Sequence, residues 1–337
     1  MASPIDTDAW SRRYREKLVA PDEGRLLITN FLGSDQEEDL TEPPNCHGFG
    51  RIRHFHRLVP GWVDNPLPLD PARRALGLAP TDVLEAEVFQ NAACNWRCWY
   101  CYVPFNLLSA NQLRSRWLSA GEMVDMYSQE VKRPSVIDLS GGQPDLAPEW
   151  VPWMMRALQE RGLENTVYLW SDVNLSTDYF SQFLSEEDRD FVATYPMYGR
   201  VGCFKGFDEA SFSFNTRATP ELFARQFKIM GLLLDAGLDV YAYATFTTPF
   251  AHNIADKMAR FVDRLQELDP WLPLRTVPLL VQTFTPVQHR IHSEHRSAFK
   301  YQYCALEQWN RQMELRYSAE DRVRDIALVP LRRQRSR

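Results

Sequence analysis

Apolar residues follow a regular pattern between about residues 84 and 285. Short apolar runs of strand type alternate there with segments in which apolar residues recur every three or four positions, as they do on one face of a helix. The strand-type runs are residues 84–90, 135–140, 166–171, 199–206, 239–247 and 276–284. Strands that alternate with helices predict a parallel sheet with right-handed crossovers.

The intervening segments carry recognisable helix ends. Ser119 and Glu122 are spaced as a capping box, and Asp145 is the expected N-cap of a helix that ends near Gly162. Thr219 and Pro220 are expected to start a helix that Gly237 closes. Asn253 is expected to start a helix that runs through Leu268. Six strand–helix units in about 200 residues suit an open barrel better than an eight-unit one. The expected fold class is therefore α/β, a partial (β/α)6 barrel.

The regions that flank this core look different. Residues 1–83 hold many prolines and few periodic runs, and we expect an N-terminal extension packed on the core, with a loop and one short helix at 66–80. Residues 84–285 form the expected barrel. Residues 286–337 are expected to be a less regular C-terminal segment that ends in a basic run.

Composition narrows the class of protein. The chain has 337 residues, 45% of them hydrophobic, and a net charge of −6, which argues against a general nucleic-acid binder. No apolar stretch approaches the roughly 18 residues that a membrane-spanning helix needs. Because the first ten residues are polar and acidic, no secretory signal is expected. We therefore expect a cytoplasmic protein with no membrane or nucleic-acid partner.

Three of the six cysteines fall within eight residues. Cys94, Cys98 and Cys101 form a C-x3-C-x2-C array directly after the first predicted strand, and parallel α/β folds bind ligands at the carboxyl ends of their strands. A closed zinc site needs four protein ligands, and a fourth is absent locally. Three thiolates instead leave one iron of a 4Fe–4S cluster without a protein ligand. Structural zinc and inert buried thiols are the alternatives.

The segment CNWRCWYC (94–101) resembles the cysteine motif of the radical S-adenosylmethionine (radical SAM) superfamily, with an asparagine after the first cysteine and Tyr100 before the third. The resemblance implies that the three cysteines hold a 4Fe–4S cluster whose open iron binds SAM. Reductive cleavage of SAM would give methionine and a 5′-deoxyadenosyl radical that abstracts a hydrogen atom. Reduced flavodoxin or ferredoxin is the electron donor that the family implies.

Further segments extend the resemblance. SGGQPD (140–145) is similar to the family's Gly-Gly-Glu-Pro motif, which implies that Gly141 and Gly142 bring backbone carbonyls to the SAM ammonium. Gln143 stands where Glu is usual, so it can accept a hydrogen bond through its amide oxygen but loses the charge.

Two later strand ends complete the expected SAM site, together with Tyr100. WSDVNLS (170–176) resembles a ribose-binding edge, with Ser171, Asp172 and Asn174 as contacts, although a polar Asx turn is equally consistent. CFKGFDEASF (203–212) looks like a segment of the glycyl-radical activating enzymes, with Cys203 where Asp is expected. Lys205 would then pair with the SAM carboxylate, because a lysine in an apolar strand needs an anionic partner.

Weaker patterns leave alternatives open. Cys46, His47, His54 and His56 could bind a metal or have a structural role. The basic residues Arg51, Arg53, His54 and Arg57 could meet an acidic electron donor or form a solvated face. Tyr241, Tyr243 and Thr245 alternate and share one face of their strand, which is either the barrel lining or the helix-packed side.

The sequence therefore predicts a radical SAM enzyme that acts on a small-molecule or peptide substrate. One alternative is an activase of a glycyl-radical enzyme. The other is a non-catalytic iron–sulfur or zinc protein, in which the substitutions at Gln143 and Cys203 mark lost SAM binding.

Overall fold

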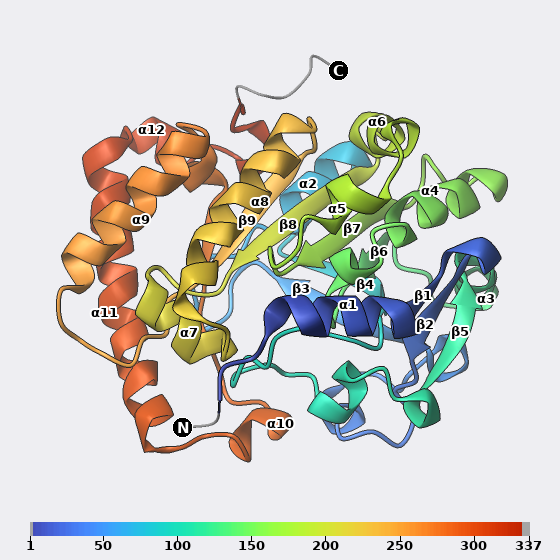
Figure 1. The fold of residues 1–337 in the computed structure, drawn as a ribbon. Coiled ribbons are helices and arrows are strands. Elements are labelled where there is room, and N and C mark those ends of the chain that lie inside the picture. Colours follow the sequence, from blue (N-terminus) through green and yellow to red (C-terminus); the bar gives the residue numbers. More distant parts are fainter. Residues whose placement is uncertain (1–2, 332–337) are drawn as a thin grey trace.

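The computed structural model describes residues 3–331. Its main element is a sheet of seven strands in the order β10-β9-β8-β7-β6-β4-β3. The strands are β3 (Gly50–His56), β4 (Val83–Phe89), β6 (Val136–Leu139), β7 (Tyr168–Val173), β8 (Tyr198–Phe204), β9 (Val240–Thr245) and β10 (Thr276–Leu279). From β4 to β10 the strands are parallel, and the sheet curls into a partial barrel (Figure 1), which confirms the expected fold class.

Helices cover the outer face of this sheet, as a crossover after each parallel strand requires (Figure 1). They are α3 (Ala120–Gln129), α4 (Trp150–Glu160), α5 (Tyr179–Phe183), α6 (Glu186–Thr194), α7 (Glu209–Thr216), α8 (Phe223–Asp235) and α9 (Ile254–Leu268). Outward strand residues such as Ile137 and Leu169 pack with Met154 of α4 and Met230 of α8 in one large core. The capping box of Ser119 with Glu122 is confirmed at the start of α3.

The inner face of the barrel has its own core. Val136, Tyr168, Trp170, Val201 and Tyr241 point inward and are at most 1% exposed. They pack with Leu67, with Leu69 and Ala72 of α2 (Leu69–Ala75), and with Ile326. Segments from both ends of the chain thus fill one end of the barrel interior.

The N-terminal region also builds a second, smaller sheet beside the barrel. Strands β1 (Val19–Ala20), β2 (Arg25–Thr29) and β5 (Ser115–Ser119) pair antiparallel, after helix α1 (Thr7–Leu18). The strand β3 extends the large sheet by pairing antiparallel with β4. Pattern analysis predicted none of the three strands before residue 84.

The C-terminal region is more regular than expected. It contains α10 (Thr285–Gln288), the long α11 (Ser293–Arg316) and α12 (Ala319–Arg322). Helix α11 packs along α9, with the Trp309 ring centroid 6.3 Å from that of Phe261 and an ion pair of 2.6 Å from Arg316 to Asp263. The expectation of an irregular segment was wrong here. Of the basic run 331–337, only Leu331 is described.

Two other local predictions were wrong. Asp145 does not cap a helix, because α4 begins at Trp150 and the Asp145 carboxylate instead forms a 2.6 Å ion pair with Arg200. The last strand ends at Leu279 and not at residue 284. Its continuation leaves the sheet because the Val281 backbone hydrogen-bonds to the Gln302 side chain of α11, at 2.9 and 3.2 Å.

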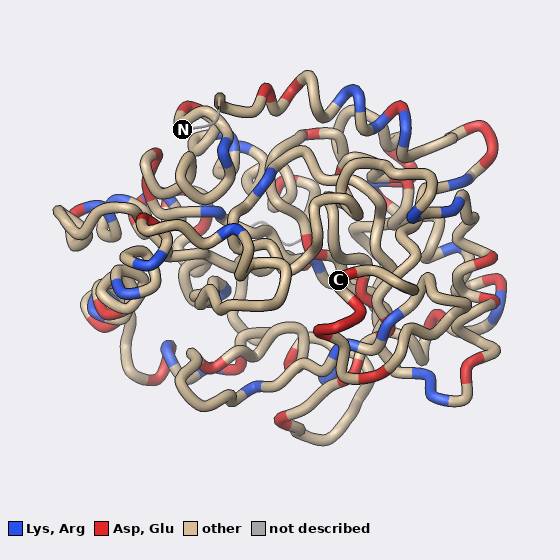
Figure 2. Tube along the Cα trace, turned by 90° about the horizontal axis from the view of Figure 1, so that it is seen from below, with Lys and Arg blue, Asp and Glu red and all other residues tan. Residues whose placement is uncertain are grey.

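Charges are mixed over the molecule. Figure 2 shows basic and acidic segments interspersed along the trace, with neither sign gathered on one side. Within residues 3–331, no helix has both the length and the apolar character to cross a membrane.

Candidate functional site

A cavity of about 240 Å³ lies at the carboxyl ends of the parallel strands. Loops after β4, β6, β7 and β8 contribute its walls, so the sheet gathers residues that are far apart in the sequence. The predicted site residues that line it are Cys94, Cys98, Tyr100, Cys101, Gly141, Gly142, Asp172, Asn174 and Lys205. Nine of the eleven predicted residues therefore share one cavity, and Gln143 and Ser171 do not line it.

The three cysteines are free thiols at the cavity wall and are all partly buried. The loop that carries them is closed by backbone hydrogen bonds from Cys94 N to Leu108 O at 3.1 Å and from Cys101 N to Cys98 O at 3.0 Å. Burial raises the pKa of Cys94 and raises the pKa of Cys98 to about 12. Binding of a metal centre by these thiols would therefore release protons.

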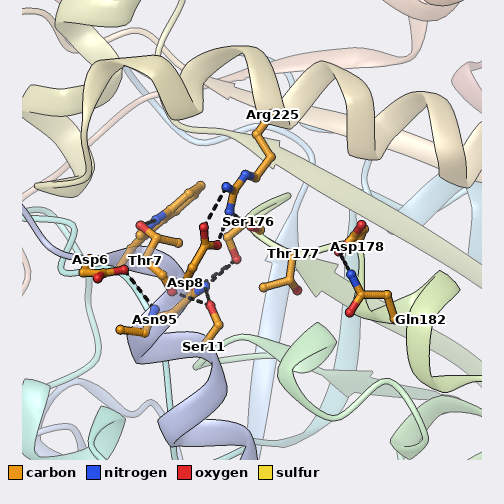
Figure 3. A network of polar contacts seen from close by, with 12 residues as sticks. Asp6, Thr7, Asp8, Ser11, Asn95, Ser176, Thr177, Asp178, Gln182 and Arg225 are labelled. Atoms are coloured by element: carbon orange, nitrogen blue, oxygen red, sulfur yellow. Dashed lines mark hydrogen bonds and ion pairs between the residues drawn. The ribbon is translucent and has the colours of Figure 1, made fainter.

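Helix α1 holds the residues between the first two cysteines. Asn95 Nδ2 donates to Ser11 Oγ at 2.8 Å, and Trp96 Nε1 donates to Thr7 Oγ1 at 3.0 Å (Figure 3). The next residue, Arg97, donates to the Tyr14 hydroxyl at 2.9 Å. Three consecutive loop residues are thus fixed to one helix of the N-terminal region.

Asn95 also links this brace to the third strand end. Its Nδ2 donates to Ser176 Oγ at 2.8 Å, and its Oδ1 accepts from Asn174 Nδ2 at 3.1 Å. The same Asn174 amide lies 3.7 Å from the Cys94 sulfur. Asn95 is fully buried, so the asparagine of the cysteine motif positions the loop and does not line the cavity.

Gly141 and Gly142 are required by close packing of the chain on itself. Their φ angles are +73° and +62°, which favour glycine. A Cβ on Gly142 would lie 2.4 Å from the Ala93 carbonyl oxygen, and one on Gly141 would lie 2.4 Å from Gln90 Oε1. The two glycines therefore let the loop after β6 lie against the cysteine loop, at the edge of the cavity.

Gln143 and Ser171 point away from the cavity, which corrects their expected role as direct contacts. Gln143 is fully buried, and its Oε1 accepts from Asn174 N at 2.8 Å. Ser171 lies on the outward face of β7, where its Oγ bonds to the Tyr198 hydroxyl at 2.7 Å. Successive side chains of a strand point to opposite faces. Ser171 therefore points outward, because the next residue, Asp172, points inward.

Asp172 belongs to a cluster of charged side chains with Arg53 and Asp138. This cluster was not predicted from the sequence. The Asp172 carboxylate accepts from Trp170 Nε1 at 2.8 Å and from Ser140 Oγ at 3.2 Å. The Arg53 guanidinium of β3 lies 3.6 Å from Asp172 and 3.3 Å from Asp138. Burial, together with the Asp172 carboxylate, raises the pKa of Asp138. Asp138 is a charged residue within the apolar run 135–140, and this position could have indicated the cluster from the sequence.

Lys205 borders the cavity beside the cysteines. It forms no ion pair with any residue in the described range 3–331, while its backbone N–H donates to Gln226 Oε1 at 2.9 Å. Burial alone would lower its pKa, but the neighbouring Cys203, Tyr100 and Cys98 groups raise it. Its side chain has no carboxylate partner within the described chain.

Tyr100 and the fifth strand line the same space. The Tyr100 hydroxyl donates to Thr245 Oγ1 at 3.2 Å, and both Cys203 and Tyr243 border the cavity. Tyr241 belongs to the inner core. The face that these strand residues share is thus the barrel lining, which resolves the choice that the sequence left open.

The cysteine and histidines of residues 46–56 do not converge on one metal site. Cys46 is fully buried and its backbone N–H donates to Glu130, whereas His54 lies 3.2 Å from Glu42 and 3.0 Å from Glu85. Ligand atoms of these last three residues are close enough for an ion, but Lys132 already bridges the two carboxylates at 2.7 and 2.8 Å. This group is an ion-pair network at the surface.

Comparison with known proteins identifies no family. No protein-family model matches the chain, and no curated protein matches it. Solved structures that match include SuiB of Streptococcus suis bound to S-adenosylmethionine, with 14% identity and a TM-score of 0.43 over 67% of this chain and 47% of that one. Another is anSMEcpe with bound AdoMet and the Cp18Cys peptide, with 14% identity and a TM-score of 0.39 over 56% of this chain and 48% of that one. The chain thus aligns with about half the length of each of these proteins.

Proposed function

We propose that the chain is a radical SAM enzyme that acts on a small-molecule or peptide substrate. The observation that carries the proposal is the shared cavity: the C-x3-C-x2-C thiols, the glycine loop and Lys205, which forms no ion pair among residues 3–331, border one space at the carboxyl ends of the strands. Each of these features follows a different strand, so the cysteine motif alone does not explain why they border the same cavity.

The residues present suit a 4Fe–4S cluster. Cys94, Cys98 and Cys101 would hold it, since all three border the same cavity. A closed zinc site would need a fourth protein ligand. In a cluster, three protein ligands leave one iron for SAM.

The residues also suit SAM, which carries a carboxylate and an ammonium. Lys205 would bind the carboxylate, because it is a cation beside the thiols with no ion pair among residues 3–331. Gly141 and Gly142 offer backbone groups at the cavity edge, and Asp172, Asn174 and Tyr100 border the same space. When bound, the cluster would supply the electron that cleaves SAM to the 5′-deoxyadenosyl radical.

The chain's own residues would orient the reactants and exclude water. Helix α1 fixes the cysteine loop through Asn95, Trp96 and Arg97. Trp99 of the cluster loop packs with Val281, and the two are 5% and 6% exposed. A dry, fixed site of this kind protects a reactive intermediate from solvent.

The decisive experiment is substrate-independent turnover. The protein is reconstituted anaerobically with iron and sulfide, mixed with dithionite and SAM, and assayed for 5′-deoxyadenosine by mass spectrometry. We expect product from the wild type, a loss of at least about 100-fold in Cys98→Ala, and wild-type turnover in Cys304→Ala, which removes an exposed thiol away from the site.

Retained product in Cys98→Ala would contradict the assignment of the cluster. A wild type that binds iron but neither cleaves SAM nor responds to it spectroscopically would support a non-catalytic iron–sulfur protein. Binding of one zinc ion in place of iron would support a structural zinc site.

A further inference from the structure

A second cavity, of about 360 Å³, adjoins the first. The residues common to both are Arg53, Trp62, Tyr102, Leu279 and Phe284. Most of its remaining wall comes from residues 36–41, from β3 and from residues 59–65, which all belong to the N-terminal region. The proposed SAM site therefore opens onto a space that none of the motifs explains.

Arg51 of β3 is a buried cation in the wall of this second cavity. It is 5% exposed, and its Nη2 donates to the Tyr102 hydroxyl at 3.2 Å. Its Nε has no hydrogen-bond partner, and no carboxylate among the described residues lies within ion-pair distance of it. Burial lowers its pKa, and the more distant Asp138 and Glu87 carboxylates oppose that shift.

The neighbouring Arg53 shows what Arg51 lacks. Arg53 has the two carboxylates of Asp138 and Asp172 within 3.6 Å. Both arginines lie on the inward side of β3, two residues apart. The earlier idea that they form part of an exposed basic face was therefore wrong. A buried charge without an ion-pair partner is costly, so an anionic ligand would explain Arg51 better than its single hydrogen bond to Tyr102 does.

Gln36 supplies a second unpartnered polar group in the same wall. It is 2% exposed, and neither its Oε1 nor its Nε2 makes a hydrogen bond within the described chain. The one acidic residue among those that line the cavity, Asp39, accepts hydrogen bonds from the backbone N–H and hydroxyl of Thr285. The buried polar groups of this wall without a hydrogen-bond partner among residues 3–331 are thus the Arg51 Nε, the Gln36 amide and the His54 Nδ1.

We propose that this second cavity is the substrate pocket and that it takes a small carboxylic acid, whose carboxylate is bound by Arg51 with Gln36 as a further hydrogen-bond partner. One uncompensated cation matches one negative charge, and the planar guanidinium fits a carboxylate. Aromatic walls from Phe55, Trp62 and Phe284 would cover the apolar part of the molecule. The assignment of this ligand as a substrate rests on the proposed function.

A ligand-binding experiment without SAM or reductant tests this proposal separately from the radical chemistry. The probes are 4-fluorophenylacetate and its neutral analogue 4-fluorophenylacetamide, titrated with the anaerobically reconstituted protein and followed by 19F NMR. We expect the acid to bind at least about 10-fold more tightly than the amide, which corresponds to about 1.4 kcal/mol. Arg51→Gln should abolish this preference, and Gln36→Leu should reduce it. Arg311→Gln, on the exposed side of α11, should leave it intact.

Stability separates recognition from a structural role. Because Arg51 lacks a carboxylate partner, Arg51→Gln should leave the urea midpoint unchanged or raise it. Equal binding of acid and amide by the wild type, or an unchanged preference in Arg51→Gln, would overturn the proposal. A marked loss of stability in Arg51→Gln would overturn it too, because that result would assign the arginine to the fold. Failure of 5′-deoxyadenosine formation with intact acid binding would instead refute the proposed function alone.

Discussion

At one end of the barrel interior the inward side chains are large, apolar or aromatic, and packed against Leu67, Leu69 and Ile326. At the carboxyl end, the same strands present Asp138, Asp172, Cys203, Lys205 and Tyr243, four of which line a cavity. The change occurs within single strands: on β7, Tyr168 and Trp170 belong to the inner core while Asp172 borders the cavity. Barrel folds commonly divide stability and function between their two ends in this way.

The difference has an energetic consequence. At the packed end, every inward residue has partners from the chain, so a substitution there should cost stability. At the cavity end, Lys205 and Arg51 have no carboxylate partner within residues 3–331, so their replacement should cost binding and little stability. Sites selected for function often show this trade-off.

The largest effect is expected at the packed end. Leu69→Ala deletes a fully buried side chain of α2 that contacts the inner core, and such deletions cost about 2–5 kcal/mol. Urea unfolding measures the loss, and SAM affinity of the folded fraction should be unchanged. Leu113→Ala is the control, because Leu113 is 93% exposed and should change stability by less than about 0.5 kcal/mol. A loss of SAM affinity with unchanged stability would contradict the assignment of stability to the packed end and of binding to the cavity end.

An intermediate effect is expected at the cavity end. Lys205→Met keeps the length and apolar stem of the side chain but removes the cation that we propose binds the SAM carboxylate. We expect the Kd for SAM to rise about 10–100-fold, or about 1.4–2.7 kcal/mol, with the urea midpoint unchanged or higher. Isothermal titration of the reconstituted protein with SAM gives the affinity. The matched control is Lys228→Met on α8, away from the cavity, and an equal effect there would refute the role of Lys205.

An effect that depends on pH is expected on the outer face of β4. Burial raises the pKa of Glu87 to about 7, from 4.5 for a free side chain. Between these values the folded protein binds more protons than the unfolded chain, so this carboxyl lowers stability as pH rises from about 4.5 to 7. Glu87→Gln removes that loss.

The variant should gain up to about 3 kcal/mol over the wild type at pH 8 and little at pH 4.5, since one pKa unit corresponds to about 1.36 kcal/mol. Urea unfolding at both pH values measures the gain. SAM affinity should not change, because Glu87 does not line either cavity. An equal effect at both pH values would show that the charge of Glu87 is not the cause.

The part of the fold that repeats was predictable from local pattern. Six parallel strands and their crossover helices follow from apolar runs, and the capping box at Ser119 follows from two residue types at fixed spacing. Strand β3 was missed because arginines and histidines replace the apolar alternation, even though its arginines face the interior. Helix α11 was missed because its buried positions include His295, Ala298 and Gln302, which carry little apolar signal.

The candidate site was predictable where chemistry is local. The cysteines, the glycines and Lys205 each stand out in their own segment. The outward orientation of Ser171 and the internal bond of Gln143 depend on strand register and packing, which a motif does not contain. Arg51 and Gln36 depend on how the N-terminal region folds back over the barrel. That Arg51 has no carboxylate partner and Gln36 no side-chain hydrogen bond among residues 3–331 is visible only in three dimensions.

We propose that the cavity end of the barrel holds a cluster with one iron open to SAM. The most direct test is the electron paramagnetic resonance spectrum of the anaerobically reconstituted, dithionite-reduced protein, recorded with and without SAM. We expect a 4Fe–4S signal whose g values change when SAM is added, with more SAM needed to produce the change in Lys205→Met. A cluster signal that saturating SAM leaves unaltered would contradict this proposal.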